Sequence, residues 1–399
     1  MTSDPAFIPL FRPSIPNPER AAEAIAKVLA SGYIGEGEVV REFERAVSML
    51  ALHSILATSS GTAALELAFR AVRRRDGYLR ALVTPQTCIA TAAPIVNIGG
   101  SIVWCDVDQK TGMISGETVA RGLEDDRFRS RQPINCVVGV DWGGRLAPWA
   151  EIRRVVDDAR PLGNRPVLIQ DAAHSFGTAF SDDYSGDLIC YSFQAIKQLT
   201  TGDGGGIAVR QFDPSDDDAK AVAKAIRLDR WFGLDREAGQ SMRCDQKPSE
   251  IGGKYQMTNV AAALGLANLE GFARRSMRRK KIAEAFRAAS CRFSDAVPHE
   301  PGFPKHAFWF FPLLIAGEAH LENDRDAFIA HARKHGFEAG EVHRRLDVMP
   351  GFRFAAENPR AWLPGVDAFS AAQVAIPCRA EMTDDEVERI CGGLWRWRT

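Results

Sequence analysis

Apolar residues along the chain follow two different periods. In one stretch they recur at spacings of three and four, which predicts a helix with one buried face. The residues of that face are Val40, Phe43, Val47 and Leu50. An earlier helix is expected to begin where Asn17 precedes Pro18, because proline suits the first helical position, and to end at Ser31-Gly32. The glycine-marked segment SGYIGEG then forms a loop between the two helices.

Elsewhere the apolar residues stand in short unbroken runs. Such runs, interleaved with helical segments, are typical of strands in a parallel sheet that is covered on both faces. They are SILAT (54–58), RALVTP (80–85), SIVWCDV (101–107), NCVVGV (135–140) and PVLIQD (166–171). The pattern therefore predicts an α/β fold with a mainly parallel sheet between helices.

The pattern changes at about Met257. Two helical segments follow, TNVAAALGLANLEG and a basic one, and lead to the apolar run FWFFPLLIA (308–316). A helix is expected at RDAFIAHARKHGF (325–337), and a last helix begins at Thr383, with Glu386 completing a capping box. We therefore predict a large domain over residues 1–256 and a smaller C-terminal α/β domain over 257–399.

Composition and charge exclude several classes of function. The 399 residues are 45% hydrophobic and 25% charged, with a net charge of −1, so no overall field attracts nucleic acid or a membrane surface. The one basic cluster is RRSMRRKK (274–281). Its charges fall all around the predicted helix, so we interpret it as a solvated surface, with an anion or nucleic-acid patch as the alternative.

The cysteines and the N-terminus point to a reducing compartment. The eight cysteines are scattered without a CxxC pair, which favours neither a disulfide framework nor a zinc site. The first twenty residues carry prolines and charges in place of the apolar core of a signal peptide, and no apolar run approaches the length of a membrane span. We expect a cytoplasmic protein.

In open parallel sheets the functional residues gather beyond the carboxyl ends of the strands. The first such end is the turn SSGT (59–62), which opens a helix and offers free N–H groups to a phosphate. The alternative is a simple helix cap. At the second end, a buried strand finishes on Asp171, with His174 three residues later. A buried carboxylate needs a cationic or hydrogen-bonding partner, although a capping aspartate beside an interior histidine explains the pair equally well.

The third strand end combines a hydroxyl, an amine and several glycines. Ser192 and Lys197 are followed by TTGDGGG (200–206), which lets the backbone approach a ligand closely. An apolar pocket disfavours the ammonium form of lysine and makes the amine a nucleophile. An exposed lysine is the alternative.

One ligand accounts for all three strand ends. It carries a phosphate for the helix start and Ser192, a cationic ring nitrogen for Asp171 and an aldehyde for Lys197. That ligand is pyridoxal 5′-phosphate (PLP), which needs a lysine nucleophile, an acidic partner for its pyridinium and a phosphate seat.

With these motifs, nearly the whole chain resembles the DegT/DnrJ/EryC1/StrS family of sugar aminotransferases, fold type I PLP enzymes. The matching stretches are SGYIGEGEVVREFE, SSGTAALELA, TPQTCIATAAPIVNIGGSIVWCDVD, QDAAHSFGT, SFQAIKQLTTGDGGGIAV and KYQMTNVAAALGLANLE. The resemblance implies the following roles: Gly61, Thr62 and Ala63 at the phosphate with Ser192, Asp171 facing the ring nitrogen, His174 where relatives often have glutamine, and Lys197 forming the internal aldimine. It also implies a homodimer with shared active sites.

The chain departs from the family at three positions. Position 88 commonly carries an aromatic residue that stacks on the cofactor, and here it is Cys88. Lys254 replaces an asparagine that reaches the partner's phosphate in many relatives, a role that a lysine can serve as a point charge. Gln256 replaces a common arginine. The segment DVDQKTG imitates a calcium loop, but Lys110 occupies a ligand position, so we expect no metal there.

These motifs predict an aminotransferase. By resemblance, the amino donor is L-glutamate and the acceptor is a nucleotide-linked keto-deoxysugar. A PLP-dependent sugar dehydratase of the same family is one alternative, and Lys197 argues against it because those relatives carry histidine at the lysine position. A non-catalytic PLP-binding regulator is the other alternative.

Overall fold

The computed structural model describes residues 7–126, 132–159, 165–178, 185–210, 217–235, 245–294, 306–315, 324–359 and 361–397. Within them, a sheet of seven strands forms the centre of the molecule. In sheet order the strands are β1 (Ile55–Thr58), β7 (Gly205–Val209), β6 (Leu188–Ser192), β5 (Val167–Asp171), β4 (Cys136–Val140), β2 (Arg80–Val83) and β3 (Ser101–Trp104).

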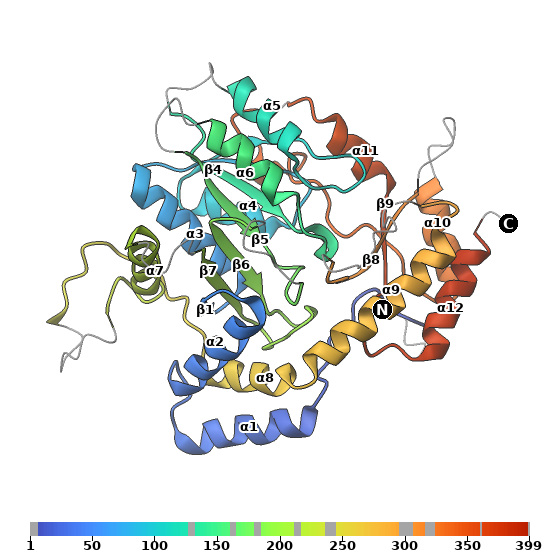
Figure 1. Ribbon diagram of the computed structural model, residues 1–399, viewed down its shortest axis with the longest axis horizontal. Coiled ribbons are helices and arrows are strands. Elements are labelled where there is room, and N and C mark those ends of the chain that lie inside the picture. The colour runs from blue at the N-terminus through green and yellow to red at the C-terminus, as the bar shows by residue number, and fades with distance from the viewer. Residues whose placement is uncertain are drawn as a thin grey trace.

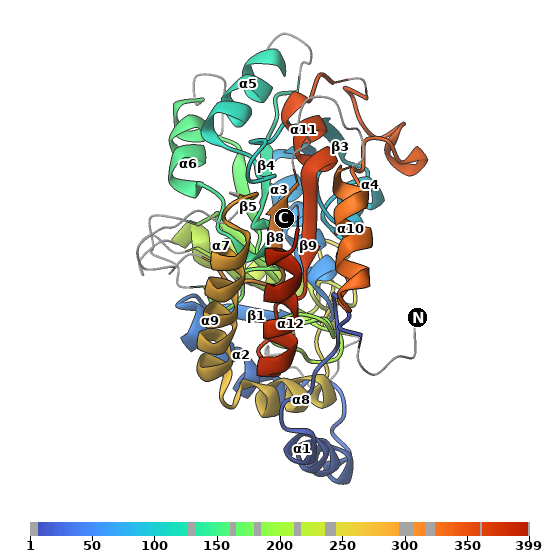
Figure 2. The same ribbon diagram turned by 90° about the vertical axis from the view of Figure 1, so that its right-hand side faces the viewer.

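The sheet is mainly parallel, as predicted. Strand β7 runs antiparallel to both β1 and β6, and the other paired strands are parallel. Every strand is almost completely buried, because helices lie on both faces (Figures 1 and 2). This arrangement explains the unbroken apolar runs in the sequence.

The described helices surround this sheet and continue into the C-terminal part of the chain. They are α1 (Pro18–Ser31), α2 (Glu38–Ala51), α3 (Gly61–Asp76), α4 (Ile89–Asn97), α5 (Gly116–Asp126), α6 (Trp149–Asp158), α7 (Asp217–Asp229), α8 (Asn259–Leu269), α9 (Phe272–Ser290), α10 (Asp324–Lys334), α11 (Pro364–Ala372) and α12 (Asp384–Trp395), with short 3-10 turns at Trp142–Gly144 and Pro350–Phe352. Helices α5 and α6 pack together on one face, and α3 packs against α4 on the other (Figure 2).

The first two helices lie where the sequence predicted them, but one residue predicted to be buried is exposed. Helix α1 begins at Pro18 and is followed by Gly32, whose φ of 73° suits glycine. The Asn17 side chain makes no cap and instead donates to the Ala267 carbonyl over 3.1 Å. Leu50 was predicted to be buried, and this prediction is wrong: it is 44% exposed, because Ala51 fills the buried position at the end of α2.

A second core lies in the C-terminal part of the chain. Helices α9, α10 and α12 pack around the antiparallel pair β8 (Phe311–Leu314) and β9 (Gln373–Ile376). The capping box of Thr383 and Glu386 at the start of α12 is confirmed. Helix α8 packs instead on α1 and α2, and α9 leads from it towards the second core (Figure 1). The division into residues 1–256 and 257–399 stays a prediction.

Two further features of the described residues concern membrane spans and cysteines. None of the helices in the described ranges is long and apolar enough to span a membrane. The cysteines of the same ranges are all free thiols. Cys244 and the first six residues lie outside the described residues.

Candidate active site

The strand ends singled out in the sequence meet at one edge of the sheet. Gly205 pairs with Ser192 on one side and with Thr58 on the other. A Cβ atom on Gly61 would lie 2.9 Å from the Ser192 Cβ, so the start of α3 touches the end of β6. A Cβ on Gly205 would lie 2.4 Å from the Ser60 carbonyl carbon. The glycine run therefore allows β7 to press against the turn before α3.

The first turn of α3 is where the phosphate seat was predicted, and that role stays a prediction. Ser60 is the N-cap, and its hydroxyl accepts the Ala63 N–H over 3.1 Å. The first N–H groups of a helix have no partner within the helix. The Ala63 N–H already donates to the Ser60 hydroxyl. The N–H groups of Gly61 and Thr62 are therefore the ones in this turn best able to donate to a phosphate. Ser192, buried beside them, supplies a hydroxyl.

Asp171 is held at the end of β5 by hydrogen bonds. Thr91 Oγ1 donates to Asp171 Oδ2 over 2.7 Å, and the Ala173 N–H donates to Oδ1 over 3.1 Å. Thr87 Oγ1 lies 2.7 Å from Thr91 Oγ1 and extends this network. Burial raises the pKa of Asp171, while the two donors and the charge of Lys197 oppose that rise. The carboxylate is thus oriented, and a further cation would stabilise its charged form.

The Lys197 amine lies on an aromatic surface in the same site. Its Nζ is 3.5 Å from the centre of the Trp309 ring. Burial lowers the pKa of Lys197 to about 8, against opposing effects of Asp171 and Cys88. Trp309 is itself fixed, because its indole N–H donates to the Ile196 carbonyl over 2.9 Å. The amine is therefore much more often neutral at physiological pH than that of an exposed lysine, as a nucleophile requires.

His174 belongs to a stack of rings beside Lys197. Its ring centre is 3.9 Å from that of Trp309 and 5.6 Å from that of His343. The Gly143 N–H donates to His174 Nδ1 over 3.3 Å. Burial and the Lys197 charge lower the pKa of His174 well below its usual range, and they lower that of His343 to about 4. Both imidazoles are therefore neutral at physiological pH.

The structure shows the environment of the three residues that depart from the family pattern, Cys88, Lys254 and Gln256. Cys88 is the N-cap of α4, is partly buried and lies within electrostatic reach of Lys197. Lys254 is exposed, with its Nζ 5.6 Å from the centre of the Trp231 ring. Gln256 forms an isolated bridge with Thr58, next to the start of α3. The role of Lys254 at a partner's phosphate stays a prediction.

The sequence missed several residues of this site. Trp309 was interpreted as part of an apolar run, and His343 was not singled out. Both reach Lys197 only through the tertiary fold, so no local spacing could reveal them. Thr91 follows Cys88 by one helical turn, and this spacing could have indicated that it faces the same side.

These residues fit PLP. The buried Asp171 carboxylate suits a cationic ring nitrogen, the start of α3 suits a phosphate, and Lys197 suits an aldehyde. His343 adds an independent sign of a ligand: its Nε2 is buried and has no hydrogen-bond partner among the described residues. Such a buried polar atom is costly unless a bound group satisfies it.

The comparisons with known proteins agree with this geometry. The model of the DegT/DnrJ/EryC1/StrS aminotransferase family matches residues 17–395. The chain belongs to this family. It is a PLP-dependent aminotransferase.

Solved structures of the same fold cover almost the whole chain. AtS13 from Actinomadura melliaura is 28% identical, with a TM-score of 0.84 over 98% of this chain and 99% of that one. The sugar aminotransferase CalS13 from Micromonospora echinospora is 27% identical, with a TM-score of 0.82 over 98% and 100% of the two chains. Spr1654 from Streptococcus pneumoniae, in its PLP form, shares the fold at 21% identity, with a TM-score of 0.83 over 97% of each chain.

Proposed function

We propose that this aminotransferase moves an amino group from L-glutamate to a nucleotide-linked keto-deoxysugar. The observation that carries the proposal is the juxtaposition of Lys197, with its lowered pKa, and the buried Asp171 in one site. The sugar substrate is supported by likeness to CalS13, which is named a sugar aminotransferase. The nucleotide and the donor rest on the family resemblance.

Each polar residue of the site takes a distinct role in this proposal. Bound PLP supplies a carbonyl carbon that takes up the amino group and a ring that accepts electron density. Lys197 provides the neutral amine that holds the cofactor, and its Nζ then takes a proton from the donor's α-carbon and delivers it to that carbonyl carbon. Asp171 keeps a proton on the ring nitrogen. Gly61, Thr62 and Ser192 bind the phosphate.

The neighbouring rings set the polarity around the Lys197 amine. His174 and Trp309 exclude water from one side of it, and His174 adds no positive charge because its pKa is low. Water exclusion favours the neutral amine. Cys88 has no aromatic ring that could stack on the cofactor. We propose that the stacked pair His174 and Trp309 provides this contact instead. We further propose a homodimer in which Lys254 reaches the phosphate of the partner's site.

Neither alternative function explains the site as well. A dehydratase of this family has no use for a lysine at position 197. A PLP-binding regulator needs the phosphate seat but has no need of a lysine with a lowered pKa beside a buried carboxylate.

The proposal is tested by its two half-reactions. PLP-loaded protein mixed with L-glutamate should release 2-oxoglutarate, and its visible spectrum should change to that of the pyridoxamine form. A panel of nucleotide-linked keto-sugars should then restore the PLP spectrum and yield an amino sugar. Lys197→Ala should give neither change. A wild-type protein that binds PLP but turns over no donor or acceptor would instead favour the regulator.

A further inference from the structure

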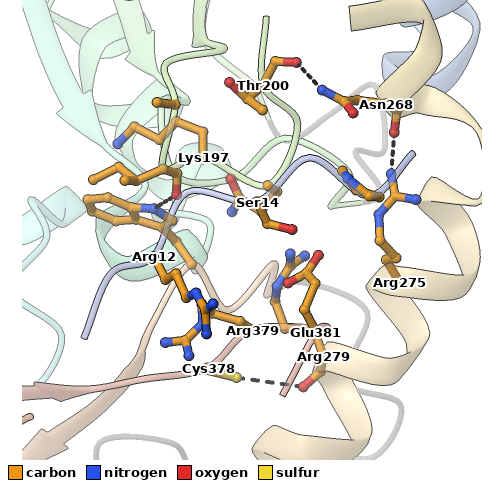
Figure 3. A pocket seen from close by; sticks show the side chains of 15 residues that line it. Arg12, Ser14, Lys197, Thr200, Asn268, Arg275, Arg279, Cys378, Arg379 and Glu381 are labelled. Atoms are coloured by element: carbon orange, nitrogen blue, oxygen red, sulfur yellow. Dashed lines mark hydrogen bonds between the residues drawn. The ribbon is translucent and has the colours of Figure 1, made fainter. Parts of the chain in front are cut away.

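A pocket beside Lys197 is lined by a cluster of arginines that the reaction does not use. Arg12 comes from the N-terminal arm (residues 7–17), Arg275 and Arg279 from α9, and Arg379 from the segment after β9. Figure 3 shows Arg279 and Arg379 on the side of this pocket opposite Lys197. The lining also includes one carboxylate, Glu381. We call these four arginines the arginine pocket.

Arg279 is the centre of the argument. It is only 7% exposed, and within the described part of the chain its guanidinium has no hydrogen bond and no ion pair. Burial lowers its pKa, and Cys378 and Glu381 oppose that effect only by charge at a distance. A buried cation without a partner is strongly unfavourable. A guanidinium aimed into a pocket in this way indicates that an anion completes the site.

Among the residues that the structure describes, the other arginines of the pocket also form no ion pair with a carboxylate. Arg379 donates to the Pro9 carbonyl over 2.5 Å, and Arg275 donates to the Asn268 and Glu270 carbonyls. Arg12 is exposed. Backbone carbonyls orient these side chains without neutralising them, so the four arginines and Glu381 leave a formal charge of +3. The arrangement holds several donors ready for one strongly negative group.

Two other buried arginines in the described residues, Arg80 and Arg230, behave differently. Arg80 pairs with both Asp126 and Glu357, and Arg230 pairs with Glu44 over 2.8 Å. Carboxylates therefore neutralise these two structural arginines. The arginines of the pocket have no such ion pair within the described residues, so a structural role does not explain them.

The pocket also corrects the interpretation of the basic run 274–281. Arg275 and Arg279 are one helical turn apart and line the pocket together. Arg278 points elsewhere and pairs with Asp384 on the surface. The run is therefore a solvated surface on one side of α9 and part of an arginine-lined pocket on the other.

We propose that the arginine pocket binds a phosphate-type oxyanion. Arginine binds phosphate through paired, charge-assisted hydrogen bonds, and a charge of +3 suits a diphosphate better than a single carboxylate. Two sources share this chemistry: the diphosphate of a nucleotide-linked substrate, and a free phosphate ligand that acts as an effector. We assign the first, because Lys197 and Trp309, which belong to the candidate active site, also line this pocket. That assignment rests on the proposed function, while the anion site does not.

Calorimetry on the PLP-loaded protein tests the anion site. Inorganic pyrophosphate and uridine diphosphate should both bind, uridine should not, and the affinity should fall as salt is added. Arg279→Met should weaken binding of both by roughly ten- to a hundredfold, and Arg279→Lys should recover part of the loss. The matched control is Arg278→Met on the same helix, which should leave binding unchanged. If Arg279→Met does not fold, Arg12→Gln on the exposed arm should still weaken binding by about threefold.

The outcomes of these experiments test the anion site and the proposed function independently of each other. With a nucleotide-linked acceptor, Arg279→Met should raise KM while the half-reaction with L-glutamate keeps its rate. Arginine-dependent binding of pyrophosphate that does not compete with the acceptor would overturn the substrate assignment and retain the anion site. Equal binding by Arg279→Met and Arg278→Met would overturn the anion site, even if the protein aminates nucleotide-linked sugars. Binding without any such amination would count against the proposed function alone.

Discussion

Replacing Lys197 with methionine should stabilise the cofactor-free protein at neutral pH. The pKa of this lysine falls from 10.5 to about 8, chiefly through burial. At 1.36 kcal/mol for each tenfold change in the ionisation constant, that fall corresponds to roughly 3.4 kcal/mol against the charged form. Because the side chain is partly exposed, solvent reduces the effect, and we expect a gain of about 2–3 kcal/mol at pH 7.

The sign of the pH dependence follows from the same values. Below pH 8 both the folded and the unfolded chain carry the proton, so the folded state bears the whole cost. Between about 8 and 10.5 the folded chain loses its proton first, and the cost declines. The advantage of Lys197→Met should therefore shrink to below about 1 kcal/mol at pH 10.

Urea denaturation of the cofactor-free proteins at pH 7 and pH 10 measures this difference. The control is Lys27→Met, since Lys27 is exposed on α1 and its replacement should give no comparable pH-dependent change. A Lys197→Met protein that is no more stable than wild type at pH 7, or that gains equally at both pH values, would refute the claim that the folded site suppresses this charge.

Other residues of the site give further expectations. Asp171→Asn removes the charge opposite the ring nitrogen and should lower turnover by orders of magnitude while PLP remains bound, as spectra and rates would show; near-normal turnover would mean a structural aspartate. Lys254→Ala should weaken PLP binding markedly in a titration, since a charge-assisted hydrogen bond contributes roughly 1.5–3 kcal/mol, and Cys88→Phe should partly restore it. Mixed dimers of Lys197→Ala and Lys254→Ala chains should regain one intact site if Lys254 serves the partner, and proven heterodimers without recovery would exclude that role.

Local signals in the sequence predicted much of the fold. Pro18 and Gly32 mark the ends of α1, because proline restricts φ to a helical value and glycine permits the positive φ that follows the helix. The strands were found because burial on both faces removes polar residues from them. Leu50 was misplaced because periodicity indicates the face of a helix but not where the neighbouring core ends.

The candidate site was predictable where it follows strand ends. Asp171 and Ser192 end neighbouring strands, so their proximity follows from a parallel sheet. Trp309 and the arginine pocket were not predictable, because α9, β9 and the N-terminal arm are distant in sequence and meet only in the folded chain. The basic run 274–281 shows the difficulty: its composition is the same whether a side chain faces water or a pocket.

The central claim is that Lys197 holds the cofactor, and borohydride reduction followed by peptide mapping tests it most directly. The wild-type protein should show visible PLP absorbance, and reduction should fix the cofactor on the peptide that contains Lys197. Lys197→Ala should still bind PLP through the phosphate seat but should carry no fixed label. A label on any other lysine, or a label that persists in Lys197→Ala, would contradict the account.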